Sequence, residues 1–358
     1  MVFADVEQRG EPRQRDIIGI VFIQIADHLI DRRAFLRQRL HAAAHLLDQL
    51  DQGAGHKLAG AFRIGRLTEL AGIHRVGQLK KLLRMLDDGR NDIYVHIDSK
   101  AKDFRREDFD GIMSQAGLFF TERTSVIWGA YSQIHSELVL LRAAAPGHYD
   151  YYHLLSGADL PIKSQDEIHA FFDAHAGREF IDFEGPVFRE EKKILLQYYY
   201  RFQERHAGRS RWLDFLDQVS IRLQKLRGVD RLKGNTMVLQ KGANWFSITD
   251  ALAQYVVEKE PQIAAMYAHT KCCDEVFLQT LVVNSPFREA LMDPTMSGGS
   301  QGFARLIDWN RGSPYTFRQA DFQELMASDC MFARKFDETV DGAIIDEIGA
   351  QVCPTWNR

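Results

Sequence analysis

The chain has few cysteines, and their positions exclude two common kinds of stabilised domain. Only four occur in 358 residues. Cys272 and Cys273 are adjacent, while Cys330 and Cys353 lie far apart, so the sequence has neither a disulfide framework nor the ligand spacing of a zinc site. A reducing compartment is the simpler expectation for such a chain.

Long hydrophobic runs are also missing. The best apolar run near the start covers residues 17–26 and is bounded by Asp16 and Asp27. It is about half the length that spans a bilayer, and no small-residue cleavage site follows it. We therefore expect no transmembrane segment, and a cytoplasmic protein for which peripheral contact with the inner membrane face stays open.

A strong excess of either charge is absent as well. The net charge is −4, with 45% hydrophobic and 26% charged residues, which is typical of an ordinary soluble globular protein. The overall charge gives no case for a nucleic-acid partner. The length allows one large domain or two ordinary ones.

The chain changes character near residue 75. Residues 1–74 are rich in Arg, Gln, Asp and Ala and show no convincing domain pattern, whereas residues 75–345 alternate between strand and helix patterns, and 346–358 form a tail. The expected helices cover 78–86, 132–145 and 166–174, and the expected strands cover 92–98, 125–128, 149–155 and 179–183. This alternation predicts an α/β fold, with Asp98 and the 156–161 loop at the carboxyl ends of strands, where ligands bind.

An acidic pair, Asp274 and Glu275, opens a predicted amphipathic helix over 275–283. A carboxylate in the first turn faces the positive end of the helix dipole and stays ionised, which suits a general base. The plainer alternative is that Asp274 caps the helix and Glu275 is a solvated acid. We expect Asp274 to cap the helix and Glu275 to be the functional member of the pair.

Residues 189–233 are basic and aromatic, with twelve Lys and Arg residues. Such a stretch fits a helical insertion with solvated charges, an acceptor-binding surface or, less well, a nucleic-acid site. The insertion interpretation is the simplest of the three.

Five segments in order resemble one family. They are residues 94–100 (Tyr-Val-His-Ile-Asp-Ser-Lys), 126–132 (Val-Ile-Trp-Gly-Ala-Tyr-Ser), 155–163 (Leu-Ser-Gly-Ala-Asp-Leu-Pro-Ile-Lys), 274–280 (Asp-Glu-Val-Phe-Leu-Gln-Thr) and 331–337 (Met-Phe-Ala-Arg-Lys-Phe-Asp). Together they resemble the core-2/I-branching β-1,6-N-acetylglucosaminyltransferase family (glycosyltransferase family 14), which includes the peptide O-xylosyltransferases. The resemblance covers about residues 75–340 and suggests a bacterial-type member.

The resemblance implies a GT-A type glycosyltransferase fold, with a mixed, mainly parallel sheet flanked by helices. It implies an inverting transfer of N-acetylglucosamine or xylose from a UDP-sugar to an acceptor hydroxyl, with no metal or other cofactor because basic side chains stabilise the diphosphate. Glu275 matches the family's base. Lys335 and, with a one-residue gap, Arg311 match the groups at the diphosphate, where Arg318 and Arg334 compete with Arg311.

The remaining matches concern recognition. Asp98 and Trp128 match donor-binding positions, Trp309 matches an aromatic of the acceptor site, and Asp159 lies in a loop expected at the acceptor end. Each has a plainer alternative: a strand-end cap for Asp98, a surface lysine for Lys335, core aromatics for the two tryptophans and a simple turn for the loop. The expected acceptor is a carbohydrate, glycolipid or polysaccharide.

The start of the chain departs from the family pattern. A buried strand should precede the helix at Gln78, but Arg66 and Glu69 interrupt residues 65–73. This departure suggests that residues 1–70 are not a native part of the domain. The alternative function is therefore that of a degenerate protein, which binds carbohydrate or nucleotide without turnover. The one Asp-x-Asp string, Asp108 to Asp110, lies in a polar stretch and is interpreted as a solvated loop or helix start.

Overall fold

The computed structural model describes residues 20–23, 71–206, 211–312 and 314–356. Within these ranges the centre of the molecule is a six-stranded sheet in the order β3-β2-β1-β4-β7-β6. β1 pairs in parallel with β2 and β4, and β2 with β3, whereas β7 runs antiparallel to both β4 and β6. The strands are β1 (Ile20–Ile23), β2 (Asp92–Ile97), β3 (Gly117–Phe120), β4 (Tyr151–Leu155), β6 (Phe180–Ile181) and β7 (Phe246–Thr249). The predicted α/β class and the mixed, mainly parallel sheet are confirmed.

The central strands are covered on both faces. All five residues of β4 are buried, and Ile93, Val95 and Ile97 of β2 are buried too. Continuous apolar strands of this kind form where helices lie on both sides of a parallel sheet. β2 and β4 therefore bring Asp98 and Ser156 to the same edge of the sheet, as the sequence predicted.

The strand between β2 and β4 comes from an unexpected place. Ile20–Ile23 form β1, with Ile20 opposite Tyr94 on one side and Leu154 on the other. From the sequence pattern we expect this strand directly before Gln78, where residues 65–73 are a poor match. Four residues of the segment 1–70 thus belong to the sheet, and the rest of that segment lies outside the described residues.

A second, smaller sheet has the order β5-β9-β8. Its strands are β5 (Asp159–Pro161), β8 (Arg305–Ile307) and β9 (Phe332–Arg334). β8 and β9 are parallel, with Ile307 opposite Arg334, so the residues after each strand leave the sheet at the same edge. This arrangement places Trp309 and Lys335 at one end of the small sheet.

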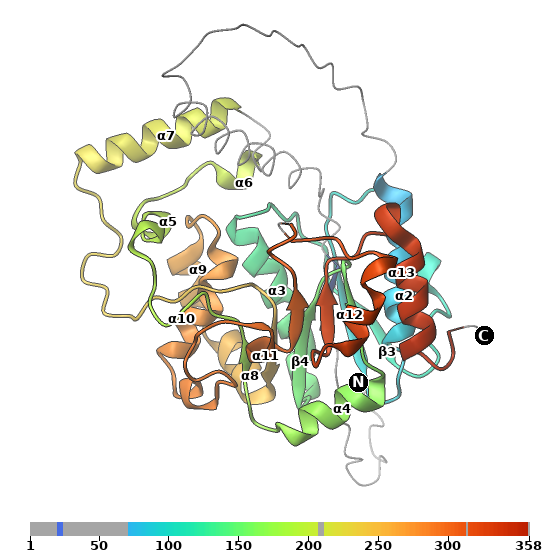
Figure 1. Ribbon diagram of the computed structural model, residues 1–358. Helices are drawn as coiled ribbons and strands as arrows, with labels where there is room; N and C mark the ends of the chain where they lie inside the picture. The colour runs from blue at the N-terminus through green and yellow to red at the C-terminus, as the bar shows by residue number, and fades with distance from the viewer. Residues whose placement is uncertain (1–19, 24–70, 207–210, 313, 357–358) are drawn as a thin grey trace, which may run out of the picture.

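Two layers of helices enclose the main sheet (Figure 1). One apolar core packs α2, α4, α12 and α13 against the sheet, and the other packs α3, α8, α9 and α10. The bounds are α2 (Ala71–Met85), α3 (Tyr131–Ala144), α4 (Gln165–Ala174), α5 (Ile194–Gln197), α6 (Gln203–His206), α7 (Arg211–Leu226), α8 (Asp250–Glu258), α9 (Glu260–Tyr267), α10 (Phe277–Val283), α11 (Ser300–Phe303), α12 (Phe322–Ala327) and α13 (Glu338–Val352).

Two sequence-based expectations change here. Residues 125–128 are not a strand, because Lys100 Nζ binds the carbonyl of Val126 and Ser132 Oγ binds the N–H of Ile127, which removes backbone groups from any ladder. β3 takes that place in the sheet. The expected tail boundary at 345 falls inside α13, where Ile348 and Val352 are buried in the core.

Candidate functional site

Glu275 lies at the end of a short turn rather than inside a helix. Cys273–Glu275 form a 3-10 turn, and α10 starts two residues later at Phe277. The predicted helix is thus present over 277–283, but it is not amphipathic, because α10 is almost wholly buried. The cap is wrong as well: Val276 occupies the N-cap of α10 without a side-chain hydrogen bond, because the Asp274 side chain is turned inward.

Lys241 holds the Glu275 carboxylate. Its Nζ lies 2.8 Å from Glu275 Oε2, and it also pairs with Glu184 Oε1. The lysine side chain is 11% exposed, whereas the Glu184 and Glu275 side chains are 37% and 39% exposed. A nearly buried cation thus lies between two carboxylates that reach solvent. Although burial acts to lower the pKa of Lys241, the two carboxylates raise it overall, so this lysine stays charged.

A close backbone contact makes this arrangement possible. Gly242 N–H donates to the Glu275 carbonyl at 3.0 Å, and Glu184 N–H donates to the Lys241 carbonyl at 2.8 Å. A Cβ on Gly242 would lie 2.0 Å from the Asp182 carbonyl oxygen. Only glycine allows the 240–243 loop to pack this closely on 182–184, which is how Lys241 and Glu184 reach the turn of Glu275.

These groups line a pocket of about 500 Å³. Trp309 lies on its rim and is 54% exposed, so the interpretation of Trp309 as a core aromatic is wrong. Residues 297–300 line the pocket as well. The pocket therefore combines a paired carboxylate with an exposed flat ring, which is the kind of surface on which a pyranose can stack.

Arg305 is a buried residue in the lining of the same pocket. It is 2% exposed, and its guanidinium donates to the carbonyls of Phe303, Leu154 and Phe246 at 2.7, 3.1 and 2.6 Å. It thereby joins β4, β7 and β8. Burial lowers its pKa to about 9, so it remains a cation near neutral pH and adds positive potential to the pocket.

Two buried acids lie behind Glu275. Asp274 Oδ2 accepts from Gln133 Nε2 at 3.0 Å, and Glu137 Oε1 accepts from Asn244 Nδ2 at 2.7 Å. Burial, reinforced by the charge of Glu275, raises the pKa of Asp274 to about 7. Burial also raises the pKa of Glu137 well above its ordinary value, with the charge of Asp274 as a further cause. Asp274 is a buried acid of the α3 interface and not a helix cap.

The turn of Trp128 is bonded to the turn of Glu275. Cys272 N–H donates to the Gly129 carbonyl at 2.8 Å, and Gln133 links the Gly129 N–H to Asp274 through its side-chain amide. Trp128 itself is 55% exposed, so it is not a core aromatic. The structure thus connects two sequence segments, 126–132 and 274–280, through one polar network.

Asp98 is fully buried at the end of β2. Its Oδ1 accepts from the N–H of Lys100 at 2.9 Å, and its Oδ2 pairs with Lys100 Nζ at 3.2 Å. Arg123 donates to the Asp98 carbonyl at 2.8 Å. The strand-end turn predicted as the plainer alternative is therefore present, and it places a buried carboxylate at the carboxyl edge of the sheet.

Asp159 is the centre of a buried cluster. Its Oδ1 accepts from Arg334 Nη1 at 3.1 Å, and its Oδ2 accepts from Trp245 Nε1 at 2.9 Å and from the N–H of Ser156. The Arg334 guanidinium lies 4.0 Å from the Trp245 ring centroid. Both oxygens of Asp159 thus contact protein groups, and the loop and β9 are held together by this pair.

Arg311 is surrounded by acids. Its guanidinium pairs with Asp308, with Asp321 at 2.7 Å and with Glu324 at 2.8 Å. It also lies 4.4 Å from the Tyr315 ring centroid. Tyr315 also links Arg311 to Lys335, because its carbonyl accepts from the Lys335 N–H at 3.3 Å. The two predicted diphosphate groups therefore lie on adjoining segments, and Arg311 is held by carboxylates.

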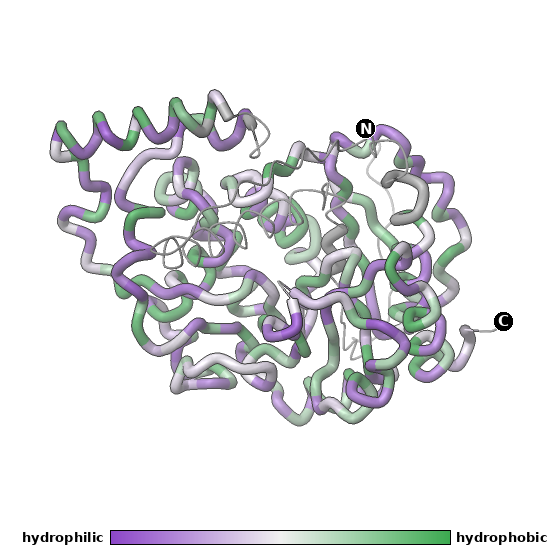
Figure 2. The backbone as a smooth tube through the Cα atoms, turned by 45° about the horizontal axis from the view of Figure 1, so that its top comes forward, coloured by the Kyte–Doolittle hydropathy of each residue, from purple (hydrophilic) through white to green (hydrophobic). Residues whose placement is uncertain are grey.

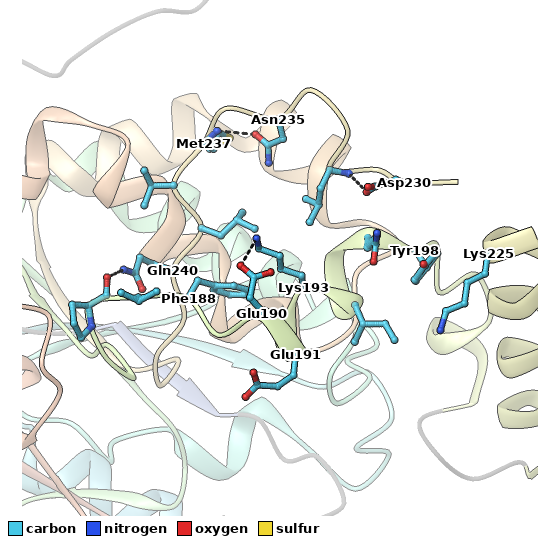
Figure 3. A pocket seen from close by; sticks show the side chains of 17 residues that line it. Phe188, Glu190, Glu191, Lys193, Tyr198, Lys225, Asp230, Asn235, Met237 and Gln240 are labelled. Atoms are coloured by element: carbon cyan, nitrogen blue, oxygen red, sulfur yellow. Dashed lines mark hydrogen bonds and ion pairs between the residues drawn. The ribbon is translucent and has the colours of Figure 1, made fainter. Parts of the chain in front are cut away.

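A second, larger pocket includes Pro186 and Gln240 in its lining. It has a volume of about 840 Å³ and is formed by residues 186–198 and 225–240. Figure 3 shows the ion pair between Lys193 and Glu190, 2.7 Å long, and Lys225 reaching in from α7. Three helices, α5, α6 and α7, lie within residues 189–233.

The Asp-x-Asp string lies apart from both pockets. Arg106–Phe109 form a 3-10 turn, and Asp108 pairs with Arg105 at 3.2 Å, as expected for a solvated helix start. In the described part of the chain, no three His, Cys, Asp or Glu side chains are grouped as metal ligands. Within the same part, no helix has both the length and the apolar character to cross a membrane.

The structure brings Glu275 and Trp309 into one pocket, and it leaves Asp98, Trp128, Asp159, Arg311 and Lys335 outside the lining of that pocket. Sequence reasoning missed Glu184, Lys241 and Arg305. Glu184 follows the strand predicted over 179–183, so the rule that ligands bind at strand ends could have found it. Lys241 and Arg305 carry no such signal, because their neighbours in space come from distant parts of the chain.

Comparison with known proteins shows the family of the chain. The family model described as Core-2/I-Branching enzyme matches residues 71–329. Xylosyltransferase 2 of Rattus norvegicus is 26% identical over 287 residues, which cover 75% of this chain and 31% of that protein. Xylosyltransferase 1 of Pan troglodytes is 23% identical over 289 residues, with 76% and 29% covered. The chain thus spans about a third of the length of these relatives.

A solved structure, the apo form of mouse xyloside xylosyltransferase 1, matches with a TM-score of 0.32 and 11% identity, over 72% of this chain and 91% of that one. This likeness is too weak to support any argument. The family model, by contrast, covers most of the chain and contains four of the five segments singled out in the sequence. The chain belongs to the core-2/I-branching enzyme family of glycosyltransferases.

Proposed function

We propose that the protein is an inverting glycosyltransferase that moves a sugar from a UDP-sugar to an acceptor hydroxyl, with Glu275 as the general base. Inversion is a single displacement at the anomeric carbon, so it needs one carboxylate to take the acceptor proton. The observation that supports this most directly is the Glu275 carboxylate, which is partly exposed in the 500 Å³ pocket and paired with Lys241.

Lys241 would act as a positioning residue. A carboxylate that is hydrogen-bonded and paired loses freedom of rotation, so its oxygens are held in one orientation toward the acceptor. The second carboxylate on the same lysine is that of Glu184, which also lines the pocket. Trp309 on the rim would stack on the acceptor sugar and exclude water from one face.

The leaving diphosphate needs positive charge in the transition state. We propose that Lys335 supplies it at the edge of the small sheet, with Arg305 adding a fixed positive potential from beneath the pocket. No metal is expected in this proposal. For Arg311 to contribute, it would have to exchange part of its three-carboxylate contact for the diphosphate.

Donor recognition is proposed for Asp98 and Trp128. The first is buried at the carboxyl edge of the sheet, and the second is an exposed ring whose turn is bonded to that of Glu275. Asp159 would act on the acceptor end by holding the 156–159 loop against Arg334. Because the named relatives are xylosyltransferases, UDP-xylose is the first donor to test and UDP-N-acetylglucosamine the second. The acceptor is proposed to be a carbohydrate, glycolipid or polysaccharide.

A screen of UDP-sugars tests the proposal. UDP release is measured for each donor with and without acceptor oligosaccharides, and the anomeric configuration of the product is read by proton NMR. We expect release from one donor that persists in EDTA and a product of inverted configuration. A retained configuration would reject the single displacement. UDP binding without turnover of any donor would instead favour a carbohydrate- or nucleotide-binding protein.

A further inference from the structure

Helix α7 (Arg211–Leu226) stands outside the two helical layers, at the margin of the molecule (Figures 1 and 2). Two polar side chains of the helix bind the rest of the chain. Gln224 exchanges two hydrogen bonds with the backbone of Tyr199, at 2.8 and 3.0 Å, and Asp217 accepts from the N–H of Phe202 at 3.4 Å. Asp217 and Gln224 are two turns apart, so they lie on the side of the helix that faces the protein, together with the half-buried Leu213, Leu216 and Ile221.

The apolar side of α7 faces away from the protein. Trp212, Phe215, Val219, Leu223 and Leu226 follow one another at spacings of three and four residues, which places them on one face. Trp212 and Leu226 are 66% and 83% exposed, and Phe215 and Leu223 are 48% and 45% exposed. The rings of Trp212 and Phe215 are stacked with centroids 5.6 Å apart. A surface helix normally buries its apolar side chains, so α7 differs from an ordinary surface helix in exposing this stripe.

The surroundings of this face are cationic. Residues 189–233 hold twelve Lys and Arg against six Asp and Glu, a net +6 in a chain of net −4, so the remainder carries −10. On α7 and just beyond it, the exposed cations Arg222, Lys225 and Arg227 flank the apolar stripe. Positive charge is therefore concentrated where the apolar side chains are exposed, although the protein as a whole is acidic.

We propose that this apolar face of α7 is a docking surface for an anionic lipid bilayer. A helix with Trp, Phe and Leu on one side and basic side chains at its flanks lies in the plane of a membrane, with the apolar side among the acyl chains and the cations at the headgroups. Trp favours that interface because its ring is apolar and its N–H is polar. The proposal is independent of the transfer reaction, and it would bring the protein to a membrane without a spanning segment.

Vesicle flotation tests the proposal with the full chain. Wild-type protein is mixed with vesicles of phosphatidylcholine alone or with phosphatidylglycerol added, and the bound fraction is measured. We expect binding only with the anionic lipid, weakened by salt. The double variant Trp212→Ser/Phe215→Ser should bind at least about tenfold more weakly. Neutralising Arg222 to Gln should weaken binding about fivefold.

Two further measurements separate the outcomes. Val187→Ser/Val238→Ser, which alters exposed apolar residues outside α7, should leave binding unchanged. Brominated phosphatidylglycerol should quench wild-type tryptophan fluorescence more than that of Trp212→Phe, which keeps an apolar ring. Wild-type protein that fails to float with anionic vesicles overturns the proposal. It is equally overturned if the chain is a dimer by light scattering and the Trp212→Ser/Phe215→Ser variant is a monomer, since the face would then bind a second copy.

Discussion

The residues around Glu275 and the helix α7 place charged and apolar side chains in opposite ways. Around Glu275, charges lie inside: Lys241 is nearly buried between two carboxylates, and Asp274 and Arg305 are buried too. On α7, apolar rings lie outside, and polar side chains hold the helix to the protein. Placement of this kind is expected to cost stability in both regions, and the variants below measure that cost.

The largest structural effect is expected at Gly242. Alanine there would place a Cβ within 2.0 Å of a backbone oxygen, and backbone moves less easily than a side chain. We expect Gly242→Ala to lower the free energy of unfolding by about 3 kcal/mol in urea titrations, and to abolish donor turnover. Gly89→Ala is the matched control, because nothing lies within 4 Å of its Cβ. Equal stability of the two variants would contradict the close-packing account.

Lys241→Met tests the lysine without altering the fold of the loop. It leaves Glu184 and Glu275 facing each other without a cation, so the base loses its fixed orientation. We expect kcat to fall about tenfold to a hundredfold. Lys259→Met, which removes an ion pair with Glu258 at the surface, serves as the control. An unchanged kcat would remove Lys241 from the positioning of the base.

Asp274→Asn tests the cost of the buried acid. The pKa of Asp274 is about 7 in the folded chain and near the ordinary 3.8 when unfolded. The unfolded chain therefore loses the proton first, so stability falls as pH rises from about 4 to about 7 and then stays level. Asn carries no such penalty, and we expect the variant to be more stable than wild type by about 1 kcal/mol or more at pH 8 but not at pH 4. Thermal melts at both pH values, with the exposed Asp329→Asn as control, measure this; a difference independent of pH would contradict it.

The smallest effect is expected on α7. Trp212→Ser/Phe215→Ser removes rings that contribute little to the core, so the free energy of unfolding should stay within about 0.5 kcal/mol of wild type. Turnover of soluble substrates should be unchanged. A large loss of stability in urea titrations would show that these rings are buried in the folded protein, and the contrast between the two regions would fail.

The sequence predicts those parts of the molecule that depend on local pattern. β2, α3, β4 and α4 lie close to the expected ranges, since each combines an apolar period with a clear end such as the capping box at Ser164. Prediction failed where the position of a residue depends on a partner that is distant in the sequence. Residues 20–23 join the sheet through β2 and β4, residues 125–128 lose their ladder to Lys100 and Ser132, and Asp274 turns inward to Gln133.

The residues of the candidate site also divide into those that the sequence indicates and those that it does not. Glu275, Lys335 and Trp309 could be named from motifs that keep their order along the chain. Lys241 and Arg305 could not, because their significance arises only when loops from different elements meet at the pocket. Arg311 illustrates the reverse: its place in the sequence suggested a diphosphate group, while the structure surrounds it with Asp308, Asp321 and Glu324.

Glu275→Gln tests the central claim most directly, through the transfer rate and the affinity for UDP measured on the same preparation. The amide keeps the size of the side chain and its contact with Lys241 but cannot take a proton. The account predicts that kcat falls by about 10²–10⁴-fold while UDP binds as tightly as to wild type. A variant that transfers sugar at the wild-type rate would remove Glu275 from the mechanism.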